Sequence, residues 1–222
     1  MTPQLPSFAE LAAAADPPLD ALALALAAEF RDVDAGEALG RLDQLGTELA
    51  QAAAQTPATP LAQARACAHL LGGRYGFAGE RTRYDHPDNS MLDVVLTTRR
   101  GLPILLSVVY AEVARRAGIP LAGVGLPGHF VVGHFGAGAP VLLDPFAGGA
   151  TVTTEADPSL LRPWRAHEIA MRMLNNLLAA FQRRADLGAA IRAAELRVAL
   201  PTEASLRPTL LAELRGLRAR LN

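Results

Sequence analysis

The chain has 222 residues, about half of them hydrophobic, and a formal net charge of −1. This length suits one large domain, or one domain with a helical extension. A near-neutral chain without a block of basic residues is not expected to bind nucleic acid. Every basic residue is an arginine, which excludes a lysine Schiff base and a P-loop lysine within this sequence.

Cys67 is the single cysteine, so the sequence excludes an intramolecular disulfide and a zinc site built from cysteines. His86 lies in a polar turn without partners for a metal site, and we expect neither a metal nor a cofactor. The amino-terminal residues MTPQLPSFAEL lack the pattern of a signal peptide. The longest apolar runs, such as residues 102–111, are too short to span a bilayer. We therefore expect a cytoplasmic protein without a membrane partner.

Residues 7–71 contain alanine and leucine at helical spacing. The clearest amphipathic pattern is formed by Leu39, Leu42, Leu45 and Leu49. Prolines divide this region, which predicts three or four helices. We expect the pair Gly72–Gly73 to end the last of them. Cys67, on that last helix, is expected to be buried and unreactive.

The middle of the chain begins with a polar turn that leads into a short helix over residues 91–98. We expect Asn89 or Ser90 to cap this helix. Gly101 then breaks the chain, and Pro103 suits the first position of a new helix. That helix continues to residue 117 and is apolar over most of its surface. It is therefore predicted to be central.

Gly118 and Pro120 end this central helix. Three short β-type runs follow at residues 121–126, 129–134 and 141–143, separated by glycine-rich turns. This pattern predicts an antiparallel meander. From Trp164 onward the spacing is helical again. The sequence thus indicates an α+β class, with helical flanks around one helix and a small antiparallel sheet.

The central segment has the layout of a thiol enzyme. A thiol nucleophile works best at a helix amino terminus, where the dipole lowers its pKa. A histidine on a facing strand takes its proton, and an aspartate on the next strand holds the other ring nitrogen. Here a glycine turn opens the helix, one strand presents His129, and a later strand ends at Asp144.

The run NSMLDVVLTTRRGLPILLSVVYAEVARRAGIPLAGVGLPGHFVVGHF, with VLLDPFAGG after it, resembles the SirB-type branch of the transglutaminase-like superfamily. The motifs RRGLP, LPGHF and LDPF, in this order, carry the resemblance. It implies a papain-like core with helical amino- and carboxy-terminal flanks. The division that follows is an amino-terminal helical region at 1–80, the transglutaminase-like core at 81–163 and a carboxy-terminal helical region at 164–222, in one compact unit.

Active members of this superfamily carry a Cys–His–Asp triad, and the resemblance assigns the histidine position to His129 and the aspartate position to Asp144. Pro103 takes the nucleophile position, because GLP stands where active members have a Gly-x-Cys turn. Proline offers no nucleophile. We therefore expect a catalytically inactive domain that binds a peptide or protein partner in the former substrate groove.

Two other functions stay open at this point. The first is a cysteine-independent hydrolase or acyltransferase that uses Ser107 with His129 and Asp144. Ser107 lies one turn after Pro103, about 6 Å deeper along the helix axis, and a buried serine bonded to the preceding turn is the alternative. The second is a structural or interaction protein that acts through its helical flanks, with their side chains filling the groove beside His129.

Single residues also have alternative roles. The His129–Asp144 pair can serve stability alone, and Asp144 can simply form a turn before Pro145. Arg100 is a candidate ligand for a carboxylate. The alternative is that one arginine of the pair Arg99–Arg100 binds an acid such as Asp93.

Asn89 is a weaker binding candidate, with the helix cap as its alternative role. His134, which comes before Phe135 and Gly136 at a strand end, is expected to be a surface loop residue.

Overall fold

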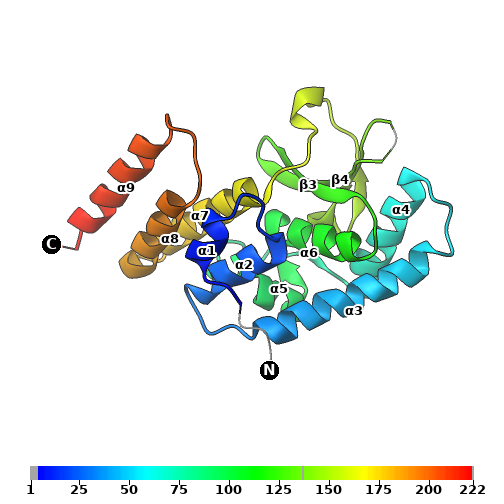
Figure 1. Ribbon diagram of the computed structural model, residues 1–222, viewed down its shortest axis with the longest axis horizontal. Helices are drawn as coiled ribbons and strands as arrows, with labels where there is room; N and C mark the ends of the chain where they lie inside the picture. The colour runs from blue at the N-terminus through cyan, green and yellow to red at the C-terminus, as the bar shows by residue number, and fades with distance from the viewer. Residues whose placement is uncertain (1–4, 137, 222) are drawn as a thin grey trace.

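The computed structural model describes residues 5–136 and 138–221. It combines helices with a small sheet, as the α+β prediction required (Figure 1). The amino-terminal helices are α1 (Phe8–Ala13), α2 (Leu19–Ala28), α3 (Ala35–Ala53) and α4 (Pro60–Cys67). Side chains of Ser7, Asp34 and Thr59 accept backbone N–H bonds at the starts of α1, α3 and α4, which explains where these helices begin.

The prediction that Gly72–Gly73 ends the last of these helices is wrong. The chain continues from α4 as the π-helix η1 (Ala68–Arg74), and the left-handed residue is Gly76, with φ of 72°. Gly72 serves a close approach, because a Cβ there would lie 1.9 Å from the carbonyl oxygen of Gly148. The glycine therefore reflects packing between distant segments rather than helix termination.

The central helix is α6 (Pro103–Arg116), and Pro103 is its first residue, as predicted. Before it lie η2 (Pro87–Ser90) and α5 (Leu92–Thr98). The prediction that Asn89 or Ser90 caps α5 is wrong, since Met91 occupies the cap position and both polar residues are buried in η2. Asn89 instead donates from Nδ2 to the carbonyl oxygens of Arg83, at 2.6 Å, and Tyr84, at 3.1 Å.

The sheet forms the predicted antiparallel meander. Its strands, in spatial order, are β3 (Leu121–Leu126), β4 (His129–His134), β5 (Val141–Asp144) and β6 (Ala150–Val152), of which β6 was not predicted. One face packs Phe130, Val132 and Leu143 into the main core. The other face carries a smaller apolar cluster of Val124, Val131 and Leu142. A separate parallel pair joins β1 (Ala78–Gly79) to β2 (Arg100–Gly101).

The remaining elements are η3 (Pro145–Ala147), η4 (Pro158–Leu160), α7 (Ala166–Arg183), α8 (Leu187–Ala199) and α9 (Arg207–Ala219). In Figure 1, α6 lies between α3 and the sheet, while α9 lies at the far end near the C terminus. One apolar cluster contains side chains from Phe8 to Leu217. The boundaries proposed at residues 80 and 163 stay predictions. Among the described residues, every helix is too short or too polar to cross a membrane.

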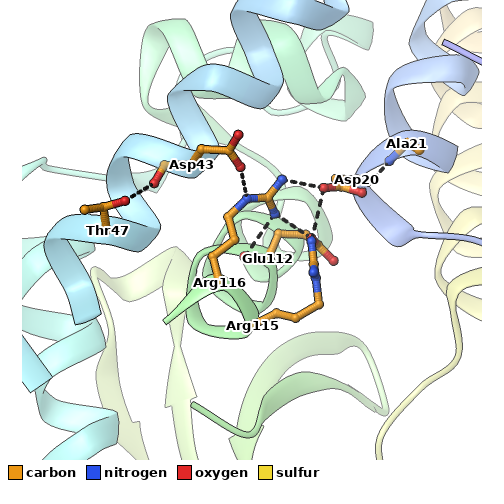
Figure 2. Close-up of polar contacts among 7 residues, drawn as sticks. All are labelled: Asp20, Ala21, Asp43, Thr47, Glu112, Arg115 and Arg116. Atoms are coloured by element: carbon orange, nitrogen blue, oxygen red, sulfur yellow. Dashed lines mark hydrogen bonds and ion pairs between the residues drawn. The ribbon is translucent and has the colours of Figure 1, made fainter. Parts of the chain in front are cut away.

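Charged side chains fix the carboxyl end of α6 (Figure 2). Arg116 bonds Asp20 of α2 at 2.6 Å, Asp43 of α3 at 2.6 Å and Glu112 at 2.8 Å. Arg115 also bonds Glu112 at 2.8 Å. Asp20 and Glu112 are buried, so each needs this compensation. We name these five residues the α6 ion-pair network; it holds α2, α3 and α6 in register.

Candidate functional site

His129 and Asp144 are in direct contact. His129 is the first residue of β4 and Asp144 the last of β5. The Nε2 atom of His129 lies 3.0 Å from Oδ2 of Asp144, so the predicted contact is present. Continued by one position, the strand register sets Asp144 opposite Val131, so His129, two residues before Val131, lies on the same face of the sheet. Their side chains are 34% and 18% exposed, which leaves the pair open to a ligand.

The second carboxylate oxygen of Asp144 holds the chain beyond it. Oδ1 accepts the Phe146 N–H at 2.9 Å, so Asp144 is fixed at both oxygens. The ring of Phe146 covers Gly79, where a Cβ would approach it to 2.3 Å. Gly79 pairs with Gly101, two residues before Pro103. These contacts connect Asp144, through Phe146 and Gly79, to β2, which comes just before α6 in the chain.

The start of α6 offers no nucleophilic side chain. Its cap residue is Leu102, which makes no side-chain cap bond, and its first residue is Pro103. Ser107, one turn further, is fully buried. The predicted bond from Ser107 to the preceding turn is absent, since its Oγ has no partner among the described residues.

Cys67 lies on α4 and is fully buried, as predicted. Burial raises the pKa of its thiol to about 12, so at neutral pH the thiolate is not populated. Neither Ser107 nor Cys67 is therefore an exposed, activated nucleophile for His129.

Comparison with known proteins identifies the family. Residues 36–175 match the transglutaminase-like superfamily, which is more than half of the chain. The chain belongs to the transglutaminase-like superfamily. No solved structure matches it significantly.

The relatives are similar over shorter segments. A UPF0162 protein of Xylella fastidiosa (strain 9a5c) is 41% identical over 96 residues, which is 43% of this chain and 34% of that protein. A UPF0162 protein of Vibrio cholerae is 31% identical over 80 residues, 36% of this chain and 30% of the relative. Mouse F-box only protein 21 is 39% identical over 64 residues, 29% of this chain and 10% of its own length. The matched segments thus span about a third or less of these relatives.

Arg172 of α7 joins this transglutaminase-like site, and the sequence analysis missed it. Its Nη2 donates to the carbonyl oxygen of His129 at 3.0 Å. Its guanidinium lies over the rings of Phe130 and Trp164. The available signal was a cation next to the apolar stripe of α7, beside Met171 and before Leu174.

The weaker binding candidates have structural contacts. The exposed Arg100 donates from Nη1 to the carbonyl oxygens of Gly76, at 2.5 Å, and Arg99, at 3.0 Å. The expected alternative, in which one of these arginines binds Asp93, is wrong because Asp93 pairs with Arg31. Arg99 donates to the carbonyl oxygen of Tyr75 at 3.1 Å. Both arginines therefore fix the loop before β1.

His134 is not the surface residue that the sequence suggested. It is 2% exposed, its Nε2 lies 2.7 Å from Oε1 of Gln63, and its Nδ1 accepts the Gly136 N–H at 3.1 Å. Burial lowers the pKa of its imidazole. His134 thus ties the end of β4 to α4. In the part of the chain that the structure describes, no group of three or more potential metal ligands is found.

Proposed function

We propose that this transglutaminase-like protein binds a peptide or protein segment beside His129 and Asp144 without acyl transfer. The observation that carries the proposal is Pro103 as the first residue of α6, where a thiol would gain most from the helix dipole. We place the chain in the SirB-type branch and in the cytoplasm as part of the same proposal.

The His129–Asp144 pair suits a binding role. Asp144 fixes the imidazole through Nε2 and leaves Nδ1 without a partner among the described residues. A held imidazole can exchange a hydrogen bond with a peptide group. Without a thiol, its capacity to take a proton has no nucleophile to activate.

Burial of Ser107 weighs against the hydrolase alternative, because a nucleophile must reach both the substrate and His129. The exposure of His129 weighs against the alternative in which flanking helices fill the groove. Arg172, from the carboxy-terminal flank, contacts only the backbone of His129.

A displayed random heptapeptide library tests the proposal. The library is panned against wild type, His129→Ala and His69→Ala, where His69 is an exposed histidine of η1. Enriched peptides should bind wild type and His69→Ala equally. Loss of a hydrogen bond should weaken binding to His129→Ala about tenfold.

The same peptides are then incubated with equimolar protein, and their masses are measured. Recovery of unchanged peptides supports binding without turnover. Hydrolysed or deamidated products that disappear with Ser107→Ala would establish the enzyme instead. A library without any enriched peptide would overturn the binding role.

A further inference from the structure

Arg172 is a partly buried cation without an acidic partner among the described residues. Burial lowers the pKa of its guanidinium, although an arginine stays charged near neutral pH. A charge that is partly removed from water is unfavourable unless an anion compensates it. Within the described ranges its one hydrogen bond, to the carbonyl oxygen of His129, leaves further N–H donors unused.

Two aromatic rings hold this guanidinium. Cζ of Arg172 lies 5.3 Å from the centroid of Phe130 and 5.7 Å from that of Trp164. The two rings pack edge to face at 5.3 Å. Trp164 covers Gly125 of β3, where a Cβ would approach the indole to 2.1 Å. A planar guanidinium fork fits the two oxygens of a carboxylate, and a fork held in advance loses little entropy on binding.

A pocket of about 240 Å³ begins one turn beyond Arg172 on α7, at Asn176, and reaches the residue before α6. Its lining includes Tyr84, Asn176 and Leu102, the residue before Pro103. Asn176 lies one turn after Arg172 on the same face of α7. Tyr84 is close enough to Arg172 to raise the pKa of its guanidinium, which opposes the effect of burial. The volume is below the usual range for a whole ligand and suits one side chain.

Two arginines of α7 lie on or near this pocket. Arg183, which lines it, is already paired with Asp85, at 2.7 Å. Arg172, one turn before Asn176, has no acidic partner within the described part of the chain. An incoming anion is therefore attracted to Arg172 rather than to Arg183.

We propose that Arg172 recognises a carboxylate of the bound peptide, whose neighbouring side chain enters the Tyr84–Asn176 pocket. This inference rests on the proposed peptide-binding function and names the ligand class. The carboxylate is either the carboxyl terminus of the peptide or an aspartate or glutamate side chain. In both cases it lies beside His129 and takes the unused N–H donors of Arg172.

Trp164 is the single tryptophan of the chain and lies against Arg172, so its fluorescence reports on this position. The full chain is titrated with N-acetylglycine, with N-acetylglycinamide and with the α-amide of N-acetylglutamate. The first carries a terminal carboxylate, the second none and the third a side-chain carboxylate. We expect a saturable change with at least one acid and about tenfold weaker binding of the neutral amide.

Substitutions test whether Arg172 causes the preference for the acid over the amide. Arg172→Gln should bind acid and amide equally, whereas Arg184→Gln, at the exposed end of α7, should keep the wild-type preference. If Arg172→Gln does not fold, Arg172→Lys should show a smaller preference, because lysine lacks the fork. Equal binding of acid and amide by wild type, or the same change with sodium chloride, overturns the inference.

His129→Ala separates this inference from the proposed function. The variant should still prefer the acid over the amide, because Arg172 contacts only the backbone of residue 129. Peptides that bind without any preference for a carboxylate would refute carboxylate recognition by Arg172 but not the peptide-binding function. Acid binding at Trp164 with no enriched heptapeptide would refute the peptide-binding function alone.

Discussion

The carboxyl end of α6 carries a closed ion-pair network, whereas the histidine–aspartate pair of β4 and β5 is partly open to solvent. Arg116 is 13% exposed and is surrounded by three carboxylates. His129 is 34% exposed, and one of its ring nitrogens has no hydrogen-bond partner among the residues that the structure describes. Charges that stabilise the fold thus have their partners inside the molecule. Charges at the candidate site retain capacity for a partner from outside.

The largest expected effect is the loss of stability on breaking the network. Arg116→Met removes the buried cation between Asp20 and Glu112 and leaves these two buried carboxylates with only the more exposed Arg115 as a partner. We expect the free energy of unfolding to fall by about 3–5 kcal/mol, measured by urea titration.

The matched control is Arg218→Met, which removes the exposed pair with Glu195. It should cost at most about 1 kcal/mol. Equal losses in the two variants would show that the network is no more important than a surface ion pair.

Protonation of Asp20 at low pH should reduce the stability that the α6 ion-pair network contributes. Burial by itself raises the pKa of this carboxyl, but hydrogen bonds from Arg116 and the Ala21 amide outweigh it and hold the pKa below its ordinary 3.8. The contribution of Asp20 is therefore complete above that value and is lost as pH falls through the lower, folded-state value. Glu112 opposes this trend in part, because burial raises its pKa.

Urea unfolding of wild type and Asp20→Asn between pH 7 and pH 3 measures this effect. The difference in unfolding free energy should be largest at neutral pH and should narrow in acid. A difference that stays constant over the whole range would show that Asp20 does not titrate with folding.

A smaller stability effect is expected at the His129–Asp144 pair. Asp144→Asn keeps an acceptor for the Phe146 N–H and loses only a half-open contact with His129. We expect a loss of about 1 kcal/mol or less in urea unfolding. A loss as large as that of Arg116→Met would mean that His129 and Asp144 serve stability in the same way as the network.

Local sequence patterns predicted the helix and the strands that carry this site. Gly101, Pro103 and Gly118 bounded α6, since each suits a particular helix end. The alternating strands and their turns gave the meander. His129 and Asp144 then meet because His129 begins β4 and Asp144 ends the neighbouring antiparallel β5, so both lie at the same end of the sheet.

Contacts between distant segments escaped prediction. His134 is buried because Gln63, 71 residues earlier, supplies its hydrogen bond. Residue 72 must be a glycine because the backbone of Gly148 approaches it too closely for a Cβ atom. Arg172 reaches His129 from a helix 43 residues later in the chain. Nothing in the local sequence around any of these residues marks its partner.

The natural thiol, Cys67, is not expected to be labelled in the folded protein. Cys67 is fully buried, and burial raises its pKa to about 12. Iodoacetamide at neutral pH should leave it unmodified in the folded protein and modify it after denaturation. Equal labelling rates in the two states would show that Cys67 is accessible. Because Cys67 does not react in the folded protein, labelling of an introduced cysteine can be measured without interference from it.

The most direct test of the proposal that this chain has lost a nucleophile is the pKa of a thiol placed at residue 103. The side chain of His129 lies on the sheet face of the smaller apolar cluster, whereas the α6 side chains pack on the other face. An effect of His129 on this thiol would therefore show that the imidazole reaches the start of α6. The pH dependence of iodoacetamide labelling gives the thiol pKa in Pro103→Cys, alone and combined with His129→Ala. We predict a pKa below about 8.5 in the first protein, and a return toward that value in the second. An unshifted pKa, or one that is the same in both proteins, would contradict the placement of Pro103 at the nucleophile position.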